Sequence, residues 1–154
     1  MKKFILGLFL ILGALSFAAA RGLDINKVNK AGYKIFRQDD WTAGITKITD
    51  TDETSIAIFF EIVENDAAKK LLDTTKESVP EILELVSTSE NNRAYIAKYK
   101  GKDSSYYIYI FVSKKLKFKD TFATVVYGTH KDLNGSELDK LADSFFNQVE
   151  SFLR

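Results

Sequence analysis

Apolar and polar residues alternate in six stretches of this chain, and a period of two predicts β-strands. The expected strands cover residues 33–38, 41–48, 55–63, 93–100, 104–113 and 121–129. The third stretch carries an almost unbroken apolar run from Ile56 to Val63, so we place it inside the sheet, with cover on both faces. Short connections within each group of three strands favour antiparallel pairing.

Apolar residues spaced by three and four positions predict helices. One such pattern covers residues 66–88 with Pro80 inside it, and Ser78 to Glu81 matches a Ser-x-x-Glu capping box. Because proline bends or ends a helix, we expect two short helices, over residues 66–76 and 79–88.

The last helix is predicted from its cap and its apolar stripe. Asn134 and Glu137 form one capping box, Ser136 is a second candidate cap, and the stripe follows from Leu138 to Phe152. The element order is then β-β-β-α-β-β-β-α. This order predicts an α+β fold, with a mainly antiparallel sheet of about six strands covered by amphipathic helices.

The first twenty residues have the pattern of a secretory signal peptide. Met1-Lys2-Lys3 is positive, an apolar run extends from Phe4 to Phe17, and Ala18-Ala19-Ala20 offers a cleavage pattern, with a cut after Ala18 as an alternative. An uncleaved anchor is less favoured, because spanning a bilayer takes roughly 20 apolar residues. We therefore expect export to a bacterial periplasm or the medium, and no transmembrane segment after cleavage.

The remaining chain is expected to comprise a flexible lead-in over residues 21–31 and a single α+β domain over residues 32–154. The lead-in is polar with isolated apolar positions, and Gly32 precedes the first strand. A chain of this size buries enough surface for one independent core without disulfides.

Composition excludes several classes of protein. The 154 residues include no cysteine and one histidine, His130, which excludes a disulfide framework, a thiolate site and a multi-histidine metal cluster. The 22 basic and 21 acidic residues lack the excess of positive charge typical of nucleic-acid binders. We therefore expect no metal, no cofactor and no nucleic-acid partner.

Charge is nevertheless segregated along the chain. Residues 61–90 hold eight acids and three lysines, a net charge of −5, whereas residues 91–119 hold eight basic residues and Asp103, a net charge of +7. The densest basic part contains Lys114, Lys115, Lys117 and Lys119, interleaved with Leu116 and Phe118. Such a segment is predicted to contact an envelope protein, an anionic polymer or a lipid surface. The alternative is a solvated loop or a strand edge protected by lysines.

Tyrosines cluster in the same region. By alternation, Tyr95 and Tyr99 share one face of their strand, and Tyr107 and Tyr109 share one face of the next. If these two faces coincide, they form an aromatic surface that stacks a ligand or a partner's side chains. Otherwise the rings pack under a helix.

His130 is the one candidate for acid-base chemistry. Asp132 could orient it and Ser136 could act as a nucleophile, which would make the chain a cell-envelope hydrolase. The sequence lacks a Gly-x-Ser-x-Gly elbow and Ser136 suits a helix cap, so we favour a surface loop. The acidic pairs at 39–40 and 50–53 are interpreted as turn residues rather than as a cation site.

The order of elements resembles the PsbP-like fold family. The closest likeness is the strand Phe122 to Tyr127, a polar loop and the helix Leu138 to Phe145, while Asp39-Asp40 stand where the family usually has a proline ahead of a Trp. The resemblance implies a non-catalytic accessory or binding module.

We therefore expect an exported, non-enzymatic binding module. The candidate binding residues are Tyr95, Tyr99, Tyr107, Tyr109, Lys114, Lys115, Lys117 and Lys119. The alternatives are the hydrolase using His130 and a cystatin-like or nuclear-transport-factor-like ligand-binding cone.

Overall fold

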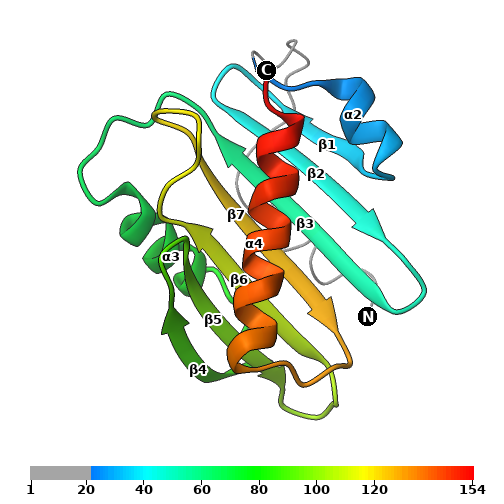
Figure 1. The fold of residues 1–154 in the computed structure, drawn as a ribbon. Coiled ribbons are helices and arrows are strands. Elements are labelled where there is room, and N and C mark those ends of the chain that lie inside the picture. Colours follow the sequence, from blue (N-terminus) through cyan, green and yellow to red (C-terminus); the bar gives the residue numbers. More distant parts are fainter. Residues whose placement is uncertain (1–21) are drawn as a thin grey trace.

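Seven antiparallel strands form one sheet, with helices on both of its faces (Figure 1). The computed structural model describes residues 22–154, so the predicted signal peptide lies outside the described residues. The strand order is β1-β2-β3-β7-β6-β5-β4. The strands are β1 (Lys34–Gln38), β2 (Thr42–Ile48), β3 (Asp52–Phe59), β4 (Leu83–Glu90), β5 (Ala94–Gly101), β6 (Tyr107–Ser113) and β7 (Phe122–Thr129). The helices are α2 (Ile25–Lys30), α3 (Ala67–Glu77) and α4 (Gly135–Phe152).

The α+β class and the antiparallel sheet are confirmed, and so are the predicted positions of α3 and α4. At the start of α4, the Asn134 backbone N–H donates to Glu137 Oε2 at 3.4 Å, as the capping box predicts. β3 is an interior strand buried on both faces, as expected, but it ends at Phe59. Glu61 adopts a left-handed backbone with φ of 58°, and the chain leaves the sheet there.

The prediction of a second short helix over residues 79–88 is wrong. Residues 83–90 form β4, which pairs with β5 on both sides of an irregularity at Val86 and adds a seventh strand to the sheet. The Pro80 carbonyl accepts from the Leu83 N–H in a turn, so Ser78 to Glu81 does not start a helix. The spacing of Ile82, Leu83 and Val86 fits either element, and pairing with β5 decides between them.

The segment predicted as a flexible lead-in carries a short helix that packs on the core. Asp24 caps α2 by accepting from the Lys27 N–H, and Leu23 and Val28 are completely buried. Leu23 forms a β-bridge with Leu153, and the Arg154 N–H donates to the Gly22 carbonyl. The two ends of the described chain therefore lie side by side.

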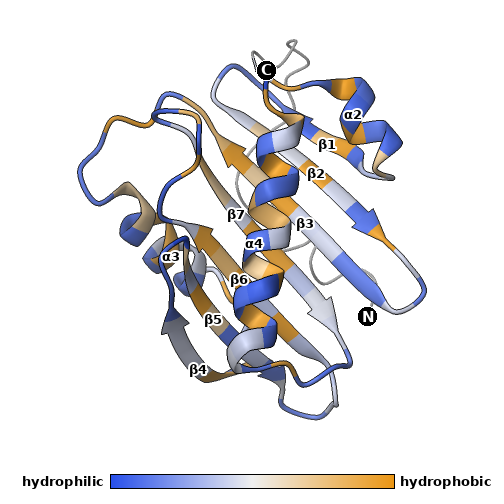
Figure 2. Cartoon of the chain, in the orientation of Figure 1, coloured by the Kyte–Doolittle hydropathy of each residue, from blue (hydrophilic) through white to orange (hydrophobic). Residues whose placement is uncertain are grey.

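Two apolar clusters lie on opposite faces of the sheet. The larger cluster packs α4 and α2 against β2, β3, β7, β6 and β5, and the smaller packs α3 against β5 and β6. In Figure 2, hydrophilic residues follow the outward side of α4, while hydrophobic residues mark the central strands. Among residues 22–154, no helix is long and apolar enough to cross a membrane.

Candidate functional site

The four candidate tyrosines lie on two opposite faces of the sheet. Tyr95 and Tyr99 belong to the cluster under α3, whereas Tyr107 and Tyr109 belong to the cluster under α4. The register places Tyr109 opposite Lys98, and residues directly opposite in an antiparallel pair share a face. The prediction of a single aromatic surface is therefore wrong. The register set by the β5–β6 turn puts the two tyrosines of β5 and the two of β6 on different faces of the sheet.

Two of these four rings are buried and two are partly buried. Tyr99 is 5% exposed and Tyr109 is completely buried, whereas Tyr95 and Tyr107 are partly buried. The Tyr109 hydroxyl accepts from the Leu133 N–H at 2.6 Å and donates to the Lys131 carbonyl at 2.9 Å. These bonds fix the loop between β7 and α4, so Tyr109 has a structural role.

Asp132 is engaged by side chains from the sheet rather than by His130. Its carboxylate accepts from the Lys98 ammonium and, at 3.1 Å, from the Tyr107 hydroxyl. The Lys98 hydrogen bond is the main reason why the pKa of Asp132 lies below its usual value.

His130 contacts a different set of groups. Its Nδ1 lies 3.5 Å from the Ser105 hydroxyl, and its ring lies edge-on to Tyr106 with 5.0 Å between centroids. Ser136 is exposed in the first turn of α4. The geometry does not bring His130, Asp132 and Ser136 together as a hydrogen-bonded set.

The lysine loop (residues 114–119) connects β6 to β7. Lys115, Lys117 and Lys119 are exposed, while Leu116 is buried in the larger cluster and Phe118 is half-buried against it. Lys114 is partly buried, forms an ion pair with Glu90 and lies over the Tyr95 ring. Three of the four predicted lysines therefore face solvent from one loop.

Backbone hydrogen bonds and one carboxylate hold this loop in place. The Lys114 N–H donates to the Arg93 carbonyl at 2.8 Å, and the Lys117 N–H donates to Glu150 Oε1 at 3.0 Å. The same Glu150 oxygen accepts from Arg93 Nη2 at 3.0 Å.

The loop also borders a shallow hollow of about 340 Å³, whose walls include Arg93, Lys115, Lys117 and Glu150. The sequence analysis did not identify Glu150 as the carboxylate that holds the lysine loop and Arg93. Its position four residues after the buried Phe146 was the available signal, because it places a carboxylate on the apolar stripe of α4.

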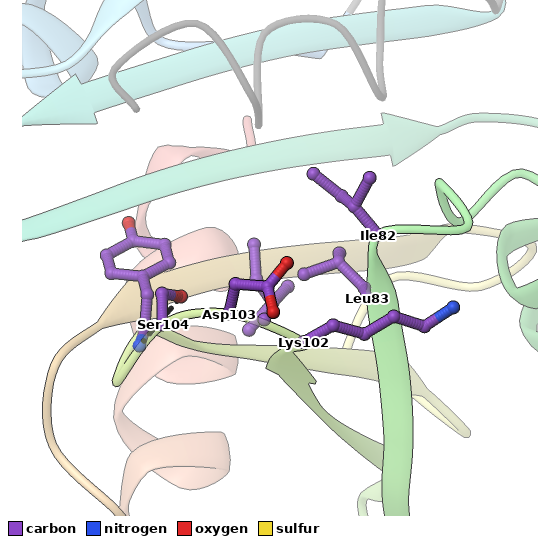
Figure 3. Close-up of a pocket in the computed structure, with 8 residues that line it drawn as sticks. Ile82, Leu83, Lys102, Asp103 and Ser104 are labelled. Carbon is purple, nitrogen blue, oxygen red and sulfur yellow. Dashed lines mark hydrogen bonds between the residues drawn. The ribbon is translucent and has the colours of Figure 1, made fainter.

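A second hollow, of about 250 Å³, lies at the other end of the sheet (Figure 3). Ile82 and Leu83 at the start of β4, together with Tyr106 and Ile108, provide its apolar walls. The turn from Gly101 to Ser104 forms the remaining rim, and Figure 3 shows Lys102 extending away from Asp103. Sequence reasoning missed this hollow because it assigned Ile82 and Leu83 to a helix.

Tyr106 also borders a smaller hollow of about 180 Å³, lined by the β2–β3 turn and His130. Burial, followed by the nearby charges of Glu53 and Asp52, raises the pKa of Tyr106.

Among the described residues, no three histidine or acidic side chains come together as a potential metal site.

The interface under α4 is filled by aromatic rings. Phe145 packs against Phe111 and Tyr127, with centroid distances of 5.6 and 5.5 Å. This packing gives no support to the ligand-binding cone.

Comparison with families of known sequences, with curated proteins and with solved structures gave no significant match.

Proposed function

We propose that this chain is an exported, non-catalytic binding module that binds a linear anionic polymer of the cell envelope through Lys115, Lys117 and Lys119. The observation that carries the proposal is the lysine loop itself, which directs three exposed ammonium groups outward from an anchored backbone. The proposal of export rests on the pattern of the first twenty residues. The proposal of a non-catalytic role rests on the different hydrogen-bond partners of His130 and Asp132.

An anchored loop favours binding because little conformational freedom is lost when a ligand arrives. Leu116 fixes the middle of the loop, Glu150 accepts from its backbone, and the Ile62 N–H donates to the Asp120 carbonyl at 2.9 Å just beyond it. The lysine side chains therefore project from a defined backbone rather than from a mobile tail.

Acidic neighbours neutralise this charge only in part. Lys117 Nζ lies 3.6 Å from Glu150 Oε2 and Lys119 Nζ lies 3.9 Å from Asp120 Oδ2, but the two lysine side chains are 79% and 91% exposed. Glu150 itself is only 7% exposed, but the lysine end of each pair faces solvent, so both ammonium groups remain accessible to a polyanion. No acidic partner of Lys115 lies within ion-pair distance in the part of the chain that the structure describes.

The burial pattern favours a polymer over a bilayer. Binding to a lipid surface combines positive charge with apolar side chains that insert between lipids. Leu116 and Phe118 are instead turned toward the core, so the loop presents charge without an exposed apolar side chain of its own.

The test is retention of the protein on immobilised dextran sulfate. We expect the triple variant Lys115→Ala, Lys117→Ala, Lys119→Ala to bind about tenfold more weakly or worse, with a shallower dependence on salt, because three charge contacts are lost. The matched control is Lys30→Ala, Lys69→Ala, Lys140→Ala, which removes the same charge from exposed positions on three helices.

Equal weakening of both triple variants would show that only net charge matters and would overturn the proposal. So would wild-type protein that does not bind dextran sulfate, or that binds phosphatidylglycerol vesicles more tightly than the polymer.

A further inference from the structure

β4 forms one edge of the sheet, and no strand within residues 22–154 pairs with its outer side. It is eight residues long, and all of them except Leu83 are exposed. The opposite edge strand, β1, has only five residues. An exposed strand edge presents backbone N–H and C=O groups that can pair with another strand.

Apolar side chains accompany this edge. Ile82, Leu85 and Val86 are each about half exposed, at 51%, 49% and 50%. Ile82 also forms part of the wall of the 250 Å³ hollow beside the start of β4 (Figure 3). Pockets for whole small ligands are about 300–1,000 Å³, so this hollow suits one apolar side chain of a larger partner.

The edge is also acidic. Glu81 and Glu84 are exposed, and no lysine or arginine of the described chain lies within ion-pair distance of either. Lys100 is opposite Glu84 in the register, but its ammonium lies over the Tyr107 ring, 5.7 Å from the centroid. A strand that pairs here therefore meets carboxylates that lack a cation.

We propose that β4 binds an extended basic segment of a partner protein as an eighth strand, with one apolar side chain of that segment in the hollow formed by Ile82, Leu83, Tyr106 and Ile108. In this mode of recognition, main-chain hydrogen bonds provide affinity and the side-chain pocket provides specificity. Lysine or arginine residues of the segment pair with Glu81 and Glu84.

A second copy of this chain is a poorer occupant of the edge. Pairing β4 with β4 would bring two acidic strands together, and like charges across strands are destabilising. The register of β4 also shifts between Leu85 and Ser87, which marks a bulge at Val86. Because a bulge bends the strand, a short peptide that can follow the bend fits this edge better than the edge strand of a second sheet does.

The test uses nine-residue synthetic peptides in which lysine alternates with valine around a central valine, leucine or phenylalanine. Amide hydrogen exchange of the full chain is followed with and without each peptide. We expect the basic peptides to slow exchange of residues 83–90, and peptides with glutamate in place of lysine to have no effect. N-methylation of the peptide backbone should weaken binding at least tenfold, because the peptide then loses its donors.

Two variants locate the site. Glu84→Lys should weaken binding of the basic peptides at least fivefold, while Asp40→Lys, an equal charge change in the exposed β1–β2 turn, should leave it unchanged. Ile82→Ser should weaken the binding of peptides with a central leucine or phenylalanine more than the binding of the peptide with a central valine. Neither substitution alters a buried side chain, so a loss of binding does not report a loss of fold.

The proposal is overturned if no basic peptide protects β4, if the glutamate peptides bind equally well, or if Glu84→Lys and Asp40→Lys have the same effect. Protection of β4 that rises with protein concentration in the absence of peptide would identify a second copy as the occupant, and would also overturn it.

Discussion

Lys98 on β5 donates hydrogen bonds to the Asp132 carboxylate and to the neighbouring Leu133 carbonyl, and so ties the sheet to the segment before α4. Its ammonium also lies over the rings of Tyr107 and Tyr109, 5.2 and 5.9 Å from their centroids. The side chain of Lys98 is only 10% exposed, so its charge depends on these partners. Asp132 therefore holds the β7–α4 loop, which explains why it does not orient His130.

Replacement of Lys98 tests this structural role. Lys98→Met keeps the aliphatic length but removes the donor, and we expect the free energy of unfolding to fall by about 1 kcal/mol or more, because at least one partly buried hydrogen bond is lost. Urea denaturation gives this value directly. The exposed Lys102→Met is the control, and equal stability of the two variants would contradict the role of Lys98.

The segment before β1 is expected to contribute to global stability. Leu23 is completely buried beside Leu153, so Leu23→Ala should lower the free energy of unfolding by about 2–5 kcal/mol through the cavity it leaves. Ile25→Ala, on the exposed side of α2, should change it by about 0.5 kcal/mol or less. Thermal or urea unfolding of both variants checks this, and similar values for the two would mean that α2 is not docked.

Gly44 on β2 lies against the ring of Phe36. A Cβ atom at this position would lie 2.7 Å from two carbons of that ring, which is closer than side-chain atoms approach one another. We expect Gly44→Ala to destabilise the protein by about 1–3 kcal/mol. The double variant with Phe36→Ala should lose less stability than the two single losses added together. Strict additivity would show that the ring does not cause the effect.

Stability should decline at alkaline pH because of buried tyrosines. Burial raises the pKa of Tyr33 from 10.0 to about 12, and its hydroxyl donates to Gln148 Oε1 at 2.8 Å. A raised folded-state pKa contributes stability that is fully present below pH 10 and is lost as the pH rises toward about 12.

Urea midpoints measured between pH 8 and pH 12 test this prediction. Tyr33→Phe should flatten the decline without abolishing it, because burial also raises the pKa of Tyr127 to about 12. An unchanged pH dependence in Tyr33→Phe would contradict the assignment.

Local pattern was sufficient for much of the fold. The apolar stripe of α4 with its Asn134 cap, the α3 pattern and the alternation in six strands all predict elements that the structure contains. These features depend on neighbours within a few positions, so the sequence displays them directly. The lysine loop was visible for the same reason, because charge density is a local property.

Contacts between distant residues could not be predicted in this way. β4 is a strand because β5 pairs with it, although its own apolar spacing fits a helix equally well. α2 is ordered because Leu23 and Val28 pack against residues from the far end of the sequence, in and just after α4. The hollow beside Ile82 exists only where the β5–β6 turn approaches the start of β4.

The sequence by itself determined the α+β class, the order of most elements and the position of the charged segments, because periodicity and composition act over short distances. The tertiary structure decided which faces the tyrosines occupy, which lysines reach solvent, and which carboxylates hold Lys98 and Arg93. These outcomes depend on strand register, where a shift of one residue moves a side chain to the other face of the sheet.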